Sequence, residues 1–150
     1  MTQEKRFALL RIVFGFAWAV DAALKWAPAV RENIVSVLTQ AQDGQPAFEV
    51  AWINVWVHIA NINPLLFGTL IACLETALAL SLIFGIFSRA ALWCGLAFSL
   101  LVWSVPQGFG GPYTSGATDI DSGIIYVFVF TALIIGRAWR HYTLFQKHLA

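Results

Sequence analysis

Four long apolar segments constrain what this chain can fold into. They cover residues 7–29, 65–87, 90–105 and 122–139. Each is close to the ~20 residues that cross the hydrocarbon core of a bilayer as a helix, although Pro106 cuts the third one short. The segments are continuous and rich in Ala and Leu instead of alternating, which favours helices over strands. We therefore expect an all-α protein whose single domain, residues 1–150, is an integral membrane four-helix bundle.

The composition supports a membrane location. Apolar residues make up 59% of the chain and charged residues only 11%, whereas about a quarter of an ordinary soluble domain is charged. The N-terminus is similar to a signal peptide, because TQEKR precedes an apolar run. Three further spans, and Arg11 within that run, instead favour a retained first helix.

The basic residues indicate how the helices are oriented. One set of helix ends carries Lys5, Arg6, Arg89, Arg137, Arg140 and Lys147. Because basic helix ends remain in the cytoplasm, we expect a multi-pass protein of the inner (cytoplasmic) membrane with both termini in the cytoplasm. The outer end is acidic, with Asp43, Glu49 and Asp121 among its charges.

The connection between the first two spans, residues 30–63, contains two amphipathic pieces. The turn signal Gly44-Gln45-Pro46 separates them. Trp52 and Trp56 are four residues apart and share one helical face, as aromatic residues do at a membrane interface. We expect this segment to lie on the outer membrane surface and pack against the spans, with gating as the alternative role.

Four charged residues fall inside apolar spans, where a charge facing lipid costs about 2.5–3.5 kcal/mol at the helix centre. They are Arg11, Asp21, Lys25 and Glu75. Asp21 and Lys25 are four residues apart and can pair along one helix. Counting ~1.5 Å per residue places Glu75 halfway along its span, between the levels of Arg11 and Lys25. Glu75 either forms an ion pair with Arg11 that locks the first two helices together, or exchanges a proton or hydrogen-bonds a ligand.

The second span carries a small residue at every fourth position. These are Thr69, Cys73, Ala77, Ser81 and Gly85. Such a stripe lets a neighbouring helix approach closely, so we expect Cys73 to be a packing residue. The helix that contains Cys94 starts at the opposite side of the membrane, so the two thiols should differ in depth by ~10 Å, which excludes a disulfide between them.

The most polar stretch is the Gly-rich loop GFGGPYTSGATDID, residues 108–121. It has the glycine spacing of a phosphate-binding loop but Ala in place of the essential Lys, and it lacks the third glycine of a dinucleotide fingerprint. We expect Thr118 or Asp119 to cap the last helix, with cation binding as the alternative. No His lies inside a span, and no Cys or His spacing suits zinc or an iron–sulfur cluster. We therefore expect no haem, metal, nucleotide or nucleic-acid ligand.

Three stretches carry a resemblance to a known family. They are RIVFGFAWAVDAALK at 11–25, LETALALSLIFGIFSR at 74–89, and GFGGPYTSGATDI followed by a helix that begins GIIYV. In these stretches the chain resembles the DoxX and DoxD group of small four-helix membrane proteins, which includes the small subunit of a thiosulfate:quinone oxidoreductase. The resemblance implies an inner-membrane bundle that works beside quinone-linked redox enzymes.

The leading functional hypothesis is a membrane subunit that binds a quinone or a similar amphipathic small molecule between its helices. The expected site is lined by Lys25, Glu75, Trp103 and Tyr113; Asp21 orients Lys25, and Glu75 accepts a proton. We expect a membrane or periplasmic protein partner besides the lipid bilayer, and the sequence leaves oligomerisation open. The alternatives are a proton, cation or solute carrier that uses Glu75 and a non-catalytic assembly subunit of a membrane complex.

Overall fold

A computed structural model describes residues 1–113 and 120–144. All regular secondary structure within these two ranges is helical, so the all-α prediction is confirmed for them. The α-helices are α1 (Gln3–Lys25), α2 (Pro28–Glu32), α3 (Ile34–Gln40), α4 (Ala47–Ile62), α5 (Pro64–Phe84), α6 (Ser88–Ser104) and α7 (Ser122–Ile135). Two short 3-10 turns, η1 (Gly108–Gly110) and η2 (Ala138–Arg140), follow α6 and α7.

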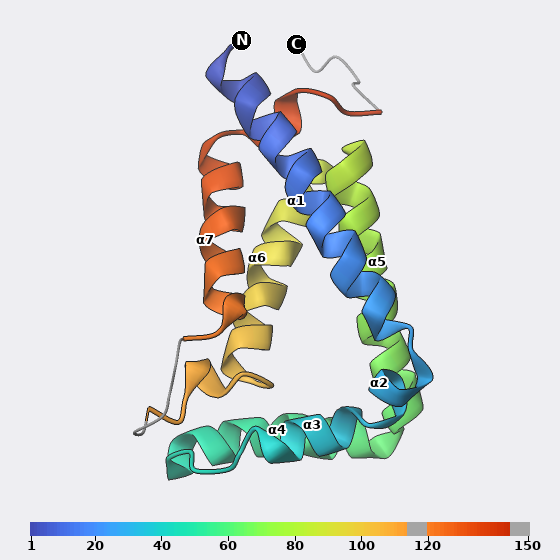
Figure 1. The fold of residues 1–150 in the computed structure, drawn as a ribbon, viewed down its shortest axis with the longest axis vertical. Helices are drawn as coiled ribbons and strands as arrows, with labels where there is room; N and C mark the ends of the chain where they lie inside the picture. Colours follow the sequence, from blue (N-terminus) through green and yellow to red (C-terminus); the bar gives the residue numbers. More distant parts are fainter. Residues whose placement is uncertain (114–119, 145–150) are drawn as a thin grey trace.

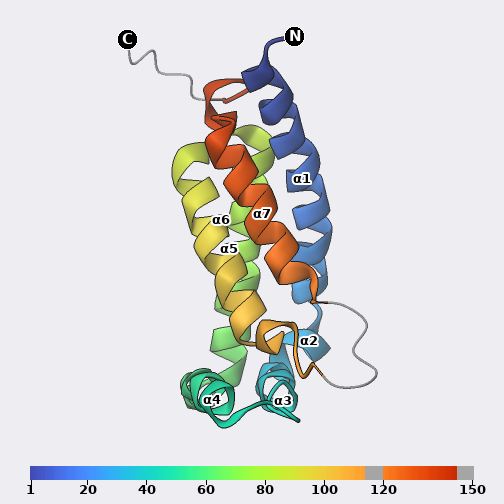
Figure 2. The same cartoon turned by 90° about the vertical axis from the view of Figure 1, so that its left-hand side faces the viewer.

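The helices α1, α5, α6 and α7 stand side by side, and a layer of helices crosses one end (Figure 1). α1 packs against α5, and α6 packs against α7. The α3 and α4 helices form the crossing layer, whereas the N-terminus and η2 lie at the opposite end (Figure 1 and Figure 2). Gly15 permits the close approach of α1 to α5, because a Cβ there would lie only 2.9 Å from Leu82 Cβ and Ile83 Cγ1.

Aromatic rings fill the space between α1, α6 and α7. Phe130 is fully buried, and its ring makes edge contacts with Phe14 at 5.1 Å and Trp18 at 5.3 Å between centroids. Gly95 makes room for Phe130, because a Cβ on Gly95 would overlap that ring. Leu82 and other aliphatic side chains of α5 complete this core.

Within residues 1–113 and 120–144, two helices are long and apolar enough to cross a membrane. They are α1, with 23 residues and a mean hydropathy of 1.8, and α5, with 21 residues and 2.0. The other two predicted spans form shorter helices of 17 and 14 residues, α6 and α7. α7 ends before the predicted residue 139, because Gly136 caps it and Arg137 has a φ of 51°. α1 likewise ends at Lys25, since Pro28 favours an extended residue before it and starts α2.

The predicted packing stripe on α5 is wrong. Cys73 is exposed, and the buried face of α5 instead contains Gly68, Ala72, Glu75, Leu78, Ala79 and Leu82. Gly68, Ala72, Glu75, Ala79 and Leu82 follow one another at alternating intervals of four and three, which is the repeat of one helix face, and Leu78 lies beside them. A strict spacing of four drifts around the helix and therefore leaves the packed face.

Candidate functional site

Asp21, Lys25 and Glu75 come together where α1 meets α5, and we call them the Lys25 cluster. Lys25 Nζ lies 3.2 Å from Asp21 Oδ2, one helical turn away as predicted, and 3.6 Å from Glu75 Oε2. The indole N–H of Trp26 donates to Thr76 Oγ1 at 2.9 Å, which fixes the end of α1 beside the turn of α5 that carries Glu75. The cluster therefore joins two elements through one lysine.

Glu75 is the buried member of the cluster. It is only 2% exposed, whereas the side chain of Lys25 is 30% exposed. Lys25 Nζ, at 3.6 Å from Glu75 Oε2, is close enough for an ion pair but too far for a hydrogen bond. Glu75 Oε2 therefore has no hydrogen-bond partner among the described residues. A buried carboxylate oxygen that lacks a hydrogen bond is costly, so this atom has capacity for a further donor.

The predicted ion pair between Arg11 and Glu75 is wrong. Arg11 is fully buried and donates to three carbonyl oxygens: Leu82 O at 2.9 Å, Ala138 O at 3.0 Å and Tyr142 O at 2.7 Å. Leu82 lies seven residues after Glu75, which corresponds to about 10 Å along α5. Arg11 therefore fastens the chain segment after α7 to α1 and α5, and Lys25 takes the place beside Glu75.

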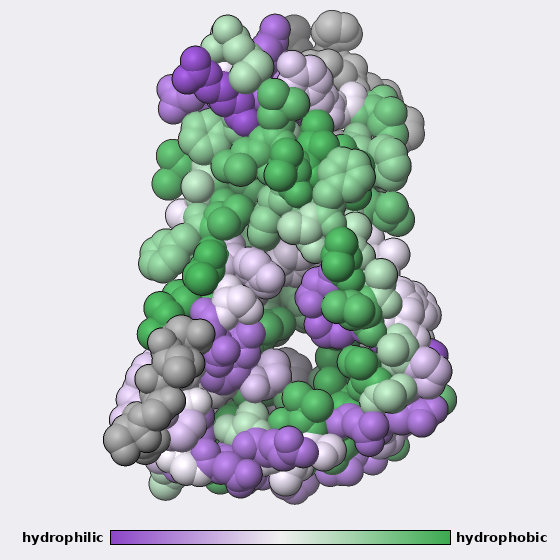
Figure 3. All heavy atoms as spheres, viewed as in Figure 1, coloured by the Kyte–Doolittle hydropathy of each residue, from purple (hydrophilic) through white to green (hydrophobic). Residues whose placement is uncertain are grey.

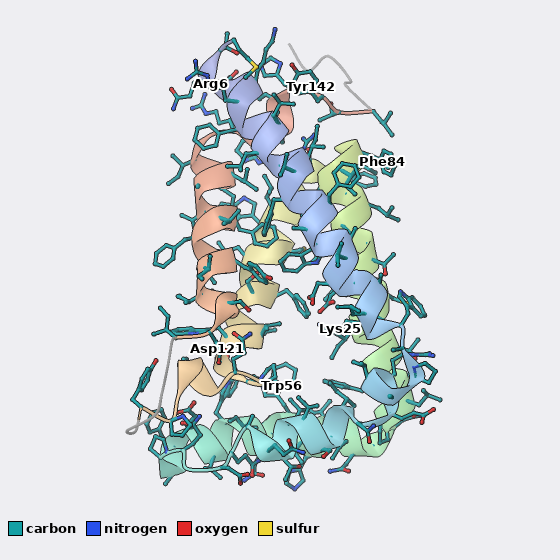
Figure 4. All side chains as sticks on the ribbon, viewed as in Figure 1. Arg6, Lys25, Trp56, Phe84, Asp121 and Tyr142 are labelled. Carbon is teal, nitrogen blue, oxygen red and sulfur yellow. The ribbon has the colours of Figure 1, made fainter. Side chains whose placement is uncertain are left out.

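Next to the Lys25 cluster the molecular surface is hollowed. Figure 3 shows an opening between α1 and α5 on one side and the α3–α4 layer on the other, with hydrophilic residues at its edge. Figure 4 shows Lys25 and Trp56 near this opening, from α1 and α4 respectively. Trp56 Nε1, Trp18 Nε1 and Ser99 Oγ are also buried without a hydrogen-bond partner in the described part of the chain. Several helices thus bury polar atoms whose hydrogen-bonding capacity is unused.

Trp103 and Tyr113 lie in a different cluster from the other predicted site residues. The Trp103 N–H donates to Ile120 O at 3.0 Å, and its ring contacts Phe109 at 5.2 Å between centroids. Tyr113 donates its hydroxyl hydrogen to Phe109 O. Phe109 therefore organises this second cluster at the α4 end. Within residues 1–113 and 120–144, no hydrogen bond, ion pair or ring contact joins this second cluster to Lys25 or Glu75. The predicted site therefore divides into two.

The first half of the Gly-rich loop packs onto the start of α4. Gly108 has a φ of 48°, and a Cβ there would overlap the Gln45 amide and lie 3.0 Å from Glu49 Oε1. The Gln45 amide in turn donates to Gly108 O at 3.3 Å. α7 begins at Ser122 with Asp121 in the N-cap position, whereas the predicted caps Thr118 and Asp119 lie outside the described residues. The glycines thus allow the loop to cover Glu49.

Glu49 is a candidate functional residue that the sequence did not single out. It is 4% exposed, and its Oε1 has no hydrogen-bond partner among the described residues. In the sequence Glu49 is an acid in the first turn of an amphipathic helix, where an exposed carboxylate is expected to interact favourably with the helix dipole. Gly108 lies close to Glu49 Oε1, and this contact joins distant parts of the chain.

Glu49 should make the stability of the protein pH-dependent. Burial raises its pKa above the ordinary value of 4.5. The folded protein therefore binds a proton more readily than the unfolded chain, so stability falls as pH rises from the ordinary glutamate pKa through the higher folded pKa. Thermal unfolding in detergent, compared between wild type and Glu49→Gln across this pH range, should show a smaller decline in the variant. Equal declines would contradict a titrating Glu49.

The described residues offer few other reactive groups. Cys73 and Cys94 are free thiols, as predicted, and both are exposed. Within residues 1–113 and 120–144, no three His, Cys, Asp or Glu side chains gather in a way that could hold a metal ion. The comparisons with known proteins give no further assignment: no family model, no curated protein and no solved structure matches this chain.

Proposed function

We propose that this chain is a DoxX-like, inner-membrane four-helix subunit that binds a quinone or a similar amphipathic small molecule beside the Lys25 cluster. The observation that carries the proposal is the buried Glu75 carboxylate, whose Oε2 has Lys25 at ion-pair distance and no hydrogen-bond donor among the described residues. Lys25, the ion-pair partner of this carboxylate, lies near the opening between the helices (Figure 4). A head group with polar oxygens on an apolar body has the chemistry that such a place accepts.

The surface of α1 supports the membrane part of the proposal. Val13, Phe16, Val20 and Leu24 are 59–65% exposed and form an apolar face that points away from the core. Lipid is the environment that covers such a face without cost. The basic residues Lys5, Arg6 and Arg137 belong to the end of the molecule opposite α3 and α4. By the positive-inside rule this end is cytoplasmic, and the α3–α4 layer lies at the outer surface.

The Lys25 cluster fits a quinone head group. The Lys25 ammonium can donate to a carbonyl oxygen of the ring, and Asp21 holds that ammonium in place. Glu75 Oε2 can accept from a ring hydroxyl in the reduced form and can hold a proton. A bound quinone supplies the capacity to accept electrons and protons. We propose that the electrons come from a membrane or periplasmic protein partner.

Binding of decylubiquinone tests this function. The indole of Trp26 is hydrogen-bonded beside the cluster, so quinone binding to detergent-solubilised protein should quench tryptophan fluorescence. Lys25→Met and Glu75→Gln should each weaken binding about tenfold, which corresponds to one hydrogen bond to a charged group. Matched controls are Lys5→Met and Glu32→Gln, since both side chains are exposed and lie outside the cluster.

Two outcomes would overturn the proposal. The first is a wild-type protein that shows no saturable quenching and copurifies with no quinone from gently extracted membranes. The second is a loss of affinity in the control variants equal to that in the cluster variants. Proton flux into liposomes that Glu75→Gln abolishes, without quinone binding, would support the carrier function instead.

A further inference from the structure

A second pocket lies at the α4 end of the molecule, and we call it the Glu49 pocket. It has a volume of about 450 Å³ and is lined by Phe48, Glu49, Phe109 and Tyr113, together with the turn at Gly44–Pro46 and Pro112. None of the three residues of the Lys25 cluster lines it. Its size is in the range of small-molecule sites, so it calls for an explanation of its own.

The polar group of this pocket is a carboxylate with unused capacity. Glu49 is only 4% exposed, and its Oε1 has no hydrogen-bond partner within the described residues. The nearby Gln45 amide donates to Gly108 O and makes no hydrogen bond to Glu49 Oε1. An isolated carboxylate in a buried position is unfavourable unless a cation or a donor joins it. The pocket is therefore suited to a positively charged group.

The remaining lining favours an organic cation over a hydrated metal ion. Three aromatic side chains line the pocket together with Glu49, and two of them are largely exposed, Phe48 at 71% and Tyr113 at 68%. The faces of aromatic rings attract ammonium groups, which bring their own apolar substituents into contact with the rings. Metal cations of the hard type require several oxygen ligands, and Glu49 is the single acid of the lining.

An apolar groove lies next to the Glu49 pocket and is lined by α6, and we call it the α6 groove. It has a volume of about 620 Å³ and shares Phe48 and Phe109 with the pocket. Ala97, Leu100 and Leu101 line it from one face of α6, and Trp52 and Trp103 also contribute. The indole N–H groups of these two tryptophans already donate to Ser104 Oγ and Ile120 O, so the groove offers carbon surface to a ligand.

We propose that this face binds a membrane lipid whose head group ends in an ammonium group, with the ammonium in the Glu49 pocket and an acyl chain in the α6 groove. Phe48 and Phe109 line both cavities, so the two cavities are neighbours, as a charged head on an apolar chain requires. α6 is an apolar helix of the proposed membrane domain, so the chain of a lipid reaches the groove from the bilayer. This lipid site uses none of the residues proposed to bind quinone.

Native mass spectrometry tests the lipid site. The full-length protein is released from nanodiscs that contain equal amounts of phosphatidylethanolamine and phosphatidylglycerol, which carry the same acyl chains. The wild type should retain phosphatidylethanolamine about tenfold over phosphatidylglycerol, as expected when one charged contact distinguishes the two lipids. Glu49→Gln should abolish this preference, and Tyr113→Leu should reduce it. Asp43→Asn is the matched control, because Asp43 is an exposed acid of the same turn outside the pocket lining.

Folding and lipid source are checked in the same experiment. Thermal unfolding should show that Glu49→Gln is at least as stable as the wild type, so its loss of preference is a binding effect. Absence of a lipid preference in the wild type, or a preference that survives in Glu49→Gln, would overturn the proposal. If N-acetylated phosphatidylethanolamine were retained equally well, the pocket would not recognise the ammonium group. If free ethanolamine displaced the lipid at equal affinity, the ligand of the pocket would be a soluble amine and not a lipid.

Discussion

Replacement of Arg11 by Met should destabilise the protein by about 3–4 kcal/mol, because each of its three hydrogen bonds contributes about 1.5–3 kcal/mol and removal of a buried charge together with rearrangement offsets part of that loss. Arg11 is fully buried, and its three hydrogen bonds reach α5, η2 and Tyr142. Met fills similar space but donates nothing, so three carbonyl groups lose a partner at once. Unfolding in detergent, followed by circular dichroism, measures the effect.

Two further variants make the Arg11 experiment specific. Arg6→Met removes an exposed arginine from the same helix and should change stability by less than about 0.5 kcal/mol. Arg11→Lys keeps the charge but replaces the planar guanidinium by a single ammonium, and its stability should fall between those of wild type and Arg11→Met. If Arg6→Met and Arg11→Met lowered the free energy of unfolding equally, the three hydrogen bonds of Arg11 would contribute nothing measurable to stability.

Replacement of Lys25 by Met should destabilise the protein by about 3–5 kcal/mol, the cost of leaving one member of a buried ion pair without its partner. Glu75 is 2% exposed, and Lys25 is the cation beside it in the described structure. The double variant Lys25→Met with Glu75→Gln removes both charges and should recover most of the lost stability. Glu75→Gln alone should have a small effect, since Lys25 keeps Asp21 as its partner.

A double-mutant cycle on unfolding in detergent measures the coupling between Lys25 and Glu75. The summed changes in unfolding free energy of the two single variants should differ from the change in the double variant by more than about 1 kcal/mol, as expected for residues in direct contact. Additive effects would contradict an energetic pair. This result concerns the folded protein alone, so it stands apart from the quinone titration.

The sequence predicted the helices better than the contacts between them. Continuous apolar runs located α1, α5, α6 and α7, because burial and lipid exposure both require uninterrupted apolar surface. The pairing of Asp21 with Lys25 was also predictable, since it depends on helical spacing alone. The partner of Glu75 was not, because depth along a helix gives no information about where a long arginine side chain extends.

Glu49 marks the limit of what the sequence alone could predict about the site. Its local pattern is that of a surface acid near a helix N-terminus, and its burial depends on the positive φ of Gly108 in a loop far along the chain. The Gly-rich loop was expected to turn the chain, and the prediction did not include what the turn would cover. Polar residues under such a loop could be found by asking which distant segment the glycines allow to approach.

The hydrogen bonds of Arg11 also set an order of events during synthesis. Arg11 belongs to α1, whereas two of its acceptors, Ala138 and Tyr142, are made 127 and 131 residues later. The N–H of Leu144 donates to Phe84 O, which closes the same junction (Figure 4). Until Ala138 and Tyr142 are made, the Arg11 guanidinium lacks these two acceptors. A nascent chain that stops before Ala138 should therefore remain open at this end.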